Sequence, residues 1–427
     1  MSGLLVRGGT VVDESGSRRA DVLVAGGMIV DVGEGLAVDS GTRVLDAGGC
    51  LVAPGLVDLH AHLRQPGQEE AETIETGTRA AALGGYTAVV AMPNTDPPAD
   101  CASVVRDVLE LAEGATCAVF PAGTITVGRA GRCLAPLAEM AAMGVRLFTD
   151  DGAGVQDAGL MRRAMEYASV LGITLAQHCE DDQLAAGGHL HEGEWSSRLG
   201  IPGIPAEAEE LMVARDIALA RLTGAPVHFL HLSTAGSVAL VRAAKGEGLA
   251  VTAEAAPHHF TLTAATTAGY DPVFKVNPPL RTDADVDAVR CGLADGTIDA
   301  IATDHAPHPP EAKEAPFDQA PPGMLGLETA LALSLTELGL PDADVLGLLS
   351  WRPARIAGVD DEHGGPVAAG RPAHLCVIDR SATWVVEPDR LASRSRNTPY
   401  AGRTVGGRVR HTVFRGEAVV IDGEAQR

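Results

Sequence analysis

Lysine is nearly absent from this sequence of 427 residues, in which only Lys245, Lys275 and Lys313 occur. Chemistry that requires a lysine side chain is therefore excluded from the first 244 residues. The seven cysteines are scattered, odd in number and form no CxxC pair, which indicates reduced thiols in a cytoplasmic protein rather than a disulfide framework.

Long apolar runs are also missing. No run of 18 or more apolar residues occurs, so we expect no membrane span. Residues 1–8 lack a basic segment followed by an apolar one and do not resemble a signal peptide. A net charge of −23 disfavours nucleic acid and anionic membranes as partners, although a pocket can still carry local positive charge for a small anion.

Short β segments separated by glycine-rich turns occupy both ends of the sequence. They are predicted at 4–7, 10–12, 21–24, 28–32 and 43–45, and again at 373–378, 383–386, 409–414 and 418–421. Neither set is long enough to stand alone. We expect residues 1–54 and 366–427 to combine into one small β-sandwich.

Residues 55–365 alternate between strand and helix patterns. Strands are predicted at 56–62, 86–91, 117–122, 145–149, 173–178, 227–231, 250–255 and 299–303. Helices are predicted between them, for example at 73–83, 160–170, 206–222, 237–245 and 328–337. Eight strands with helical crossovers predict an α/β fold of the (β/α)₈ barrel type.

Candidate metal ligands follow these strands. His60 and His62 occupy alternate positions at the end of the first strand, so both imidazoles face one side. Such a pair alone more often packs than binds metal. However, further candidates stand at the ends of strands 4, 5, 6 and 8, where barrel enzymes place their chemistry: Asp150, Asp151, His178, His231 and Asp304.

This set of side chains suits one or two divalent ions. His60 and His62 with a carboxylate can hold one ion, and His178 and His231 with a shared carboxylate can hold another. The two oxygens of a carboxylate allow it to bridge the ions, and such a pair activates water at neutral pH. Asp304 would serve as a ligand and as the proton shuttle.

Six segments together resemble the class I bacterial dihydroorotases of the amidohydrolase superfamily, from the N-terminal strands to the end of the chain. They are His60-Ala-His62-Leu-Arg64-Gln-Pro-Gly67, Met92-Pro-Asn94-Thr95, Phe148-Thr-Asp-Asp151-Gly152, His178-Cys-Glu180, Phe274-Lys-Val-Asn277-Pro-Pro-Leu-Arg281 and Asp304-His-Ala-Pro-His308. The first motif alone marks only the superfamily. The resemblance implies the reversible, metal-dependent conversion of N-carbamoyl-L-aspartate to L-dihydroorotate plus water in pyrimidine (UMP) biosynthesis.

The resemblance also assigns roles to individual residues. It implies zinc, one or two ions per chain, held by His60, His62, Asp151, His178, His231 and Asp304. It implies that Asp304 is the general acid and base. It implies substrate contacts from His62, Arg64, Asn94, Asn277, His308 and the backbone at Pro322 and Gly323. An arginine two residues beyond a ligand can bind a carboxylate through two hydrogen bonds; the alternatives are a salt bridge at the rim for Arg64 and a turn for Asn94.

Several points stay open in the sequence. Hydantoinases and dihydropyrimidinases use a carboxylated lysine after strand 4, which this chain lacks, so Asp151 is favoured as the bridge with Asp150 in reserve. His258 and His259 are expected to pack near the rim. The 309–323 loop is either a lid or a passive surface loop. The resemblance further implies a homo-oligomer and allows a complex with aspartate transcarbamoylase.

Two rival functions remain. One is a cyclic amidase acting on hydantoin-like rings, which Arg64 and Asn94 disfavour because many such substrates lack a carboxylate. The other is a non-catalytic scaffold for aspartate transcarbamoylase, which would be expected to have lost ligands. None of the expected ligands is missing here.

Overall fold

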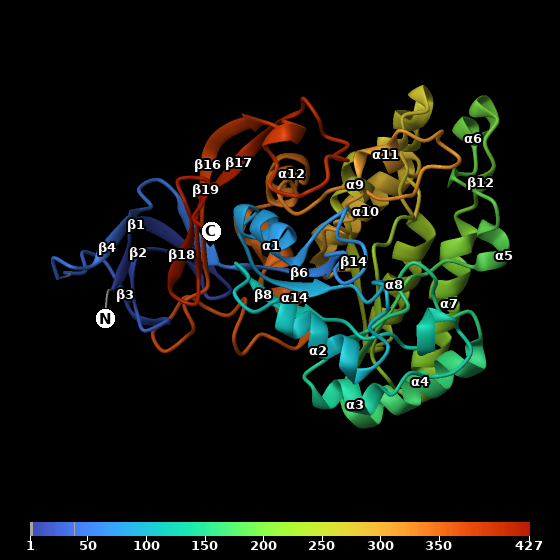
Figure 1. Ribbon diagram of the computed structural model, residues 1–427, viewed down its shortest axis with the longest axis horizontal. Coiled ribbons are helices and arrows are strands. Elements are labelled where there is room, and N and C mark those ends of the chain that lie inside the picture. Colours follow the sequence, from blue (N-terminus) through green and yellow to red (C-terminus); the bar gives the residue numbers. More distant parts are fainter. Residues whose placement is uncertain (1–2, 38) are drawn as a thin grey trace.

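A computed structural model describes residues 3–37 and 39–427. Met1 and Ser2, which begin the N-terminal segment considered above, lie outside the described residues. A β-sheet with strands from both ends of the chain occupies one end of the molecule, and an α/β body occupies the other (Figure 1). No helix in the described part of the chain is long and apolar enough to cross a membrane.

Strands from both ends of the chain form one nine-stranded sheet in the order β19-β18-β17-β16-β5-β1-β2-β3, with β4 paired to β1. The bounds are β1 (Leu4–Asp13), β2 (Gly16–Ala25), β3 (Met28–Gly33), β4 (Arg43–Asp46), β5 (Leu51–Pro54), β16 (Leu375–Val385), β17 (Thr404–Phe414), β18 (Glu417–Ile421) and β19 (Glu424–Ala425). The two ends meet where β5 pairs with β16 in antiparallel register. Their apolar side chains share one core that includes Val6, Val52, Val377 and Val413.

Two pairs of predicted segments are each a single strand. The register of β1 against β2 shifts between Val6 and Gly9, and Gly8 has a φ of 80°. Gly8 therefore forms a bulge within β1 rather than a turn between two strands, because glycine tolerates this left-handed backbone. The segments predicted at 373–378 and 383–386 likewise belong to β16, whose register against β17 shifts between Asp379 and Thr383.

Eight parallel strands form the barrel. They are β6 (Leu56–Ala61), β7 (Tyr86–Ala91), β8 (Ala118–Pro121), β9 (Leu147–Phe148), β10 (Thr174–Gln177), β13 (Val227–Phe229), β14 (Val251–Ala255) and β15 (Ala300–Ile301). Strands β6, β7 and β8 form one sheet, and β9, β10, β13, β14 and β15 form another. Parallel bridges from Gly123 to Phe148 and from Ala61 to His305 connect the edges of the two sheets. Each strand lies within its predicted range, and the predicted barrel fold is confirmed.

Helices connect the strands and cover the barrel (Figure 1). They are α1 (Ile74–Leu83), α2 (Ala102–Leu111), α3 (Leu137–Ala142), α4 (Ala158–Leu171), α7 (Glu207–Thr223), α8 (Ala235–Gly246), α10 (Asp283–Asp295), α12 (Ala330–Glu337), α13 (Asp342–Leu349) and α14 (Trp351–Ala357). Short elements lie in the loops: α5 (Asp182–Ala185), β11 (Leu190–His191), α6 (Glu194–Leu199), β12 (Gly203–Ile204), α9 (Pro257–Thr261) and α11 (Pro310–Lys313). Thr73 caps the N-terminus of α1, because its hydroxyl accepts a hydrogen bond from the Thr76 amide.

Candidate metal centre and active site

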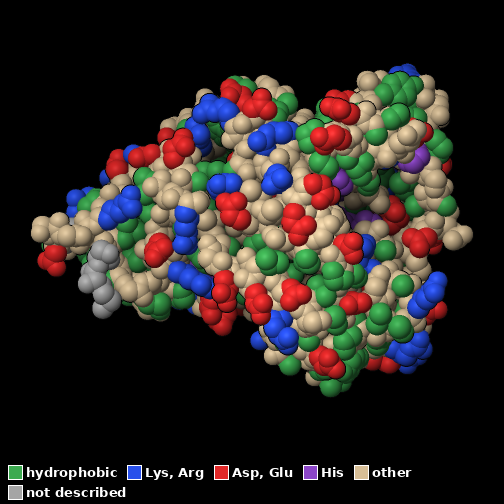
Figure 2. Space-filling view, viewed as in Figure 1, with side chains coloured by type: hydrophobic (Ala, Val, Ile, Leu, Met, Phe, Trp, Pro, Cys, Tyr) green, Lys and Arg blue, Asp and Glu red, His purple; other side chains and the backbone are tan. Residues whose placement is uncertain are grey.

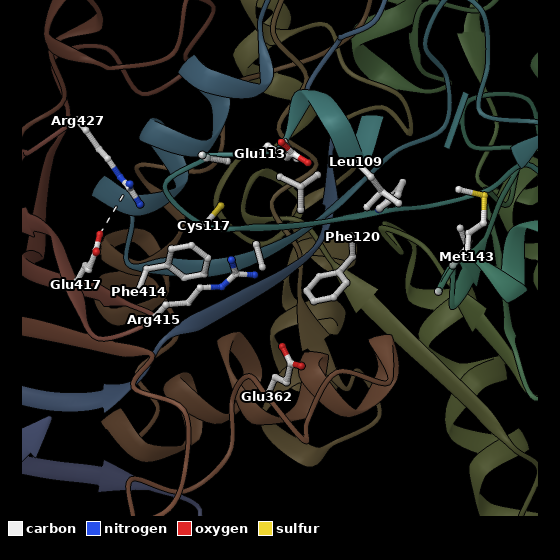
Figure 3. A pocket seen from close by; sticks show the side chains of 18 residues that line it. Leu109, Glu113, Cys117, Phe120, Met143, Glu362, Phe414, Arg415, Glu417 and Arg427 are labelled. Carbon is white, nitrogen blue, oxygen red and sulfur yellow. Dashed lines mark ion pairs between the residues drawn. The ribbon is translucent and has the colours of Figure 1, made fainter. Parts of the chain in front are cut away.

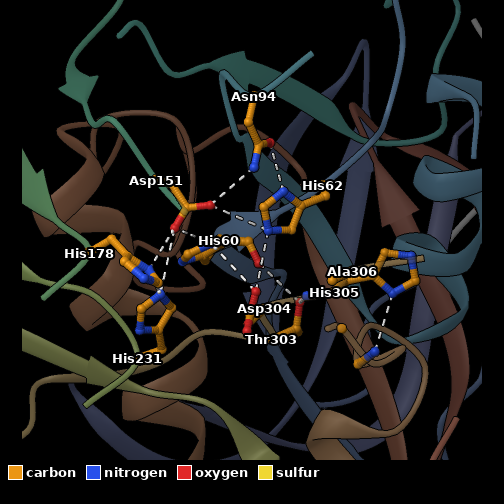
Figure 4. A network of polar contacts seen from close by, with 12 residues as sticks. His60, His62, Asn94, Asp151, His178, His231, Thr303, Asp304, His305 and Ala306 are labelled. Carbon is orange, nitrogen blue, oxygen red and sulfur yellow. Dashed lines mark hydrogen bonds and ion pairs between the residues drawn. The ribbon is translucent and has the colours of Figure 1, made fainter. Parts of the chain in front are cut away.

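The six predicted ligands converge at one end of the barrel (Figure 4). They follow or end strands β6, β9, β10, β13 and β15, so the parallel arrangement brings their side chains to the same rim. All six are buried: His60, His62, Asp151, His178, His231 and Asp304. The space-filling view shows histidine side chains inside a hollow of the surface (Figure 2).

Asp151 lies at the centre of the cluster. One carboxylate oxygen, Oδ1, lies 3.5 Å from His60 Nε2, 3.5 Å from His178 Nδ1 and 3.6 Å from His231 Nε2. The other oxygen, Oδ2, lies 3.6 Å from His62 Nε2. Asp151 thus belongs to two groups with metal-ligand spacing, one with His60 and His62 and one with His178 and His231.

The cluster fits divalent metal ions on two grounds. Ligands about 2.1 Å from a tetrahedral ion are separated by about 3.4 Å, which matches the distances around Asp151. In addition, His60 Nε2 is buried with no hydrogen-bond partner in the structure, although it faces Asp151 and Asp304. A buried polar nitrogen without a partner is costly, and coordination of a cation would satisfy it.

Charges around Asp151 keep it ionised. Burial by itself would raise the pKa of Asp151, but the charge of His60 and hydrogen bonds from His178 and His231 hold the pKa well below its ordinary value. An ionised carboxylate is the form that coordinates metal. Burial would also raise the pKa of Asp304, but its contact with His62 outweighs burial and the pKa is lowered.

Asp150, the reserve candidate for the bridge, points away from the histidines. Its Oδ1 accepts hydrogen bonds from the amides of Ile125, at 2.9 Å, and Thr126, at 3.0 Å, while Oδ2 accepts one from the Thr126 hydroxyl. These bonds fasten the loop after β8 to the end of β9. The geometry therefore places Asp151 in the cluster and gives Asp150 a structural role.

Exchanging the two aspartates for asparagine separates these roles. We expect Asp151→Asn to lose at least one equivalent of bound metal because the shared charge is removed. We expect Asp150→Asn to retain metal but to lower the melting temperature, since a buried acceptor oxygen of the Thr126 bonds is lost. Metal analysis and thermal unfolding of both purified variants check this, and full metal content in Asp151→Asn would contradict it.

A second layer of side chains orients the histidines. His60 Nδ1 lies 3.1 Å from Glu254 Oε1, and Glu254 Oε2 lies 3.0 Å from His228 Nε2. Since a carboxylate only accepts, His60 donates from Nδ1 to Glu254, and its other nitrogen, Nε2, faces Asp151. Burial opposes ionisation of Glu254, but these two histidines lower its pKa to about 2. The sequence analysis missed Glu254 and His228, although both lie on barrel strands near the cluster.

Asn94 orients His62 in the same way. Its Oδ1 lies 2.9 Å from His62 Nδ1, and its Nδ2 donates to Asp151 Oδ2 at 3.3 Å. Asn94 therefore contacts two of the predicted ligands rather than standing free at the rim. Because the amide is fixed from both sides, His62 presents Nε2 to Asp304, at 3.3 Å.

Hydrogen bonds to barrel strand β6 hold the residue that precedes Asp304. The preceding residue, Thr303, donates its amide and its hydroxyl to Asp58, at 2.8 Å and 2.6 Å. Asp304 itself has a φ of 46°, and the φ of His231 is 30°. These positive values are unusual for residues with a side chain, and such strain is found at functional positions.

His258 is a neighbour of Asp304. His258 Nε2 lies 3.8 Å from Asp304 Oδ2 and is buried without a hydrogen-bond partner. Burial lowers the pKa of His258 to about 4, so its ring is neutral. His259 packs as expected and contacts the Pro278 carbonyl at 3.0 Å.

The predicted substrate contacts lie beside this centre. Arg64 is buried and donates from Nε to the Pro307 carbonyl at 3.1 Å. His308 Nε2 lies 2.8 Å from the Pro322 carbonyl, which can only accept, so the ring proton is on Nε2. Burial, followed by the nearby Arg64, lowers the pKa of His308 to about 3. The terminal nitrogens of Arg64 form no ion pair with a carboxylate of the described residues and can receive an external anion.

Asn277 and the Pro322–Gly323 turn complete this side. Asn277 Nδ2 donates to Glu180 Oε1 at 3.1 Å, while Asn277 Oδ1 is buried without a partner. Gly323 has a φ of 143°, and an added Cβ would lie 2.8 Å from His308 Nε2. Only glycine fits here, so the turn backbone lies directly against His308.

A separate cavity of about 630 Å³ lies between β8 and the turn from β17 to β18 (Figure 3). Its lining combines Arg415 and Arg427 with Glu113, Glu362 and Glu417 and includes none of the clustered ligands. The charges are mixed in sign and exposed. We therefore place the candidate active site at the histidine cluster.

Comparisons with known proteins agree on the family. The family model described as "Dihydro-orotase-like" matches residues 49–237. A curated dihydroorotase of Streptomyces coelicolor is 50% identical over 99% of this chain and 100% of the relative, and one of Pelotomaculum thermopropionicum is 50% identical over 98% and 99%.

Solved structures match the fold. The L-hydantoinase (dihydropyrimidinase) of Arthrobacter aurescens has a TM-score of 0.89 at 25% identity and covers 100% of this chain and 98% of that protein. The dihydropyrimidinase of Brevibacillus agri has a TM-score of 0.87 at 23% identity, over 99% and 96%. Sequence identity is thus twice as high with the dihydroorotases, and this chain belongs to the dihydroorotase family.

Proposed function

We propose that this protein is a metal-dependent dihydroorotase, which interconverts N-carbamoyl-L-aspartate and L-dihydroorotate in pyrimidine synthesis. The observation that carries the proposal is the position of Asp151, shared by two histidine pairs, with Arg64 two residues beyond His62. The full-length relatives at 50% identity carry the same activity in their names.

We further propose zinc as the metal, in one or two ions per chain, because imidazole and carboxylate donors suit it. His60, His62 and Asp151 would hold one ion, and Asp151, His178 and His231 the other, with Asp304 beside the first. When bound, the metal supplies Lewis-acid polarisation of the reacting carbonyl and lowers the pKa of water.

The charges of the two compounds define what the side chains must do. N-carbamoyl-L-aspartate carries two carboxylates and dihydroorotate carries one, so ring closure consumes a proton and releases water. The site must hold one carboxylate in both directions, and Arg64 with His308 beside it provides that positive, donor-rich edge. Asn277 Oδ1, buried and without a partner, is placed to accept a hydrogen bond from a ring N–H.

Asp304 is the group proposed to move the proton. It lies between the His62 side of the cluster and His258, and it is ionised in the resting site. In hydrolysis it can therefore start as the base and then return the proton to the leaving nitrogen. In ring closure it must start protonated, so one carboxyl plays opposite parts in the two directions.

The hydantoinase-like rival rests on fold similarity at 23–25% identity. Two features of this chain oppose it. Asp151 occupies the position after β9 at which those enzymes would need a lysine, and Arg64 is prepared for a carboxylate that neutral rings lack. Dihydroorotate should therefore be a much better substrate than dihydrouracil.

A turnover assay with purified enzyme tests the proposal. We expect hydrolysis of dihydroorotate that is abolished by a chelator and restored by zinc, with one to two equivalents of metal bound. Because Asp151, and not a carboxylated lysine, would be shared by the two ions, restoration should not depend on dissolved carbon dioxide. Equal turnover of dihydrouracil would support the hydantoinase-like rival, and no turnover of either would support a scaffold.

The remaining assignments are also proposals from the resemblance. They are membership in the class I bacterial branch, a cytoplasmic location, homo-oligomerisation and a complex with aspartate transcarbamoylase. The intact ligand set supports an active enzyme rather than a scaffold alone.

A further inference from the structure

Two of the three lysines of the chain fasten a single loop, the segment 309–323 that follows β15. Lys275 Nζ donates to the Asp318 carbonyl at 3.1 Å and lies 5.8 Å from the centre of the Phe317 ring. Lys313 lies within the loop and points back toward the segment before Asn277. One lysine side chain thus reaches the loop from the 272–275 segment, and the other reaches that segment from the loop.

Lys313 makes an unusual set of contacts. Its Nζ donates to three backbone carbonyls: Pro321 at 2.8 Å, Pro272 at 3.1 Å and Lys275 at 3.3 Å. An ammonium group has three hydrogens, so each hydrogen has one carbonyl acceptor. No carboxylate of the described residues forms an ion pair with Lys313, and burial, followed by the charge of Lys275, lowers its pKa to about 7.

The proline content of the loop explains why such a donor is needed. Pro321 and Pro322 have no backbone N–H, so this turn cannot hold itself with its own amides. Its carbonyls instead receive donors from outside, Lys313 at Pro321 and His308 at Pro322. Lys313 is partly buried, and its ammonium group faces three carbonyls rather than a carboxylate, so these three hydrogen bonds fix the turn against the 272–275 segment.

The atoms that Lys313 holds are next to the proposed substrate contacts. The Lys275 carbonyl also accepts a hydrogen bond from the Gly323 amide, at 2.9 Å, and Asn277 follows two residues later. Pro322 contacts His308, which lies beside Arg64. One ammonium group thus links both segments that border the substrate side of the site.

We propose that Lys313 is a positioning residue of this active site, which ties the 309–323 loop to the 272–275 segment and so holds Pro322, Gly323 and Asn277 in place for substrate. This inference rests on the proposed dihydroorotase activity. Lys313 touches no predicted metal ligand, so its effect should fall on substrate binding rather than on the metal centre.

Lys313→Met keeps an unbranched side chain one atom shorter but removes its charge and all three donors. We expect KM for dihydroorotate to rise about tenfold or more, with kcat changed less than about threefold and metal content unchanged. Amide hydrogen exchange in 309–323 and 272–277 should speed up in the same variant. Lys313→Arg keeps a charge and donors and should give an intermediate KM.

Lys245→Met is the matched control, because Lys245 pairs with Asp299 on the outside of the barrel. It should leave KM and loop exchange unchanged. The inference is overturned if Lys313→Met leaves KM unchanged, or lowers kcat alone, or leaves exchange in 309–323 unchanged. If the wild-type protein does not turn over dihydroorotate, the proposed function fails, and the exchange measurement still decides whether Lys313 holds the loop.

Discussion

Replacing Asp304 with asparagine is expected to slow dihydroorotate hydrolysis and ring closure alike, each by at least about 100-fold, or about 2.7 kcal/mol in activation free energy. The amide keeps the size of the side chain and one oxygen toward His62, 3.3 Å away, but it cannot carry a proton. Both directions should suffer because each needs the carboxyl once as an acid and once as a base. Steady-state rates in both directions, with metal content measured in parallel, check the prediction.

Asp295→Asn is the control for this substitution, because Asp295 forms an exposed ion pair with Arg242 far from the cluster. It should change neither rate. An Asp304→Asn enzyme that retains metal and near-normal rates in either direction would contradict the role of Asp304. The proton would then travel by another route, and His308 and His258 are the first residues to test.

Removing the Arg64 guanidinium should produce the second large effect, on substrate binding. We expect Arg64→Ala to weaken binding of the substrate carboxylate by about 2–4 kcal/mol, which is a rise in KM of roughly 30-fold to 1,000-fold. The loss is large because Arg64 is buried and leaves its terminal nitrogens available beside His308. Values of KM and kcat for dihydroorotate in the variant and the wild type measure it.

Arg64→Lys and Arg162→Ala complete this experiment. The lysine variant keeps a charge but cannot form two parallel hydrogen bonds, so its KM should lie between those of the wild type and Arg64→Ala. Arg162 forms an exposed pair with Glu166 on α4 and should be neutral. If Arg64→Ala binds dihydroorotate as well as the wild type does, the carboxylate is recognised elsewhere and the hydantoinase-like rival gains support.

The sequence was sufficient for the barrel and for the identity of the clustered side chains. Strand-helix alternation is a local pattern, and the end of each strand could be located to within a few residues, as β6 and β13 show. Polar residues placed after parallel strands must meet at one rim, so His60, His178 and Asp304 could be grouped without knowing any distance. The lack of lysine before residue 245 also excluded a lysine bridge directly.

The tertiary structure decided what neighbours along the chain cannot distinguish. Asp150 and Asp151 are adjacent and chemically identical, and the structure shows that Asp150 accepts hydrogen bonds from the loop after β8 while Asp151 lies in the cluster. Glu254 and Lys313 could not be found from their local sequence. Each acts on partners brought near by barrel closure or by loop packing, His60 in the first case and Pro321 in the second. The sequence specifies the type of each side chain, whereas the direction and the partners of a side chain depend on segments that meet only in the fold.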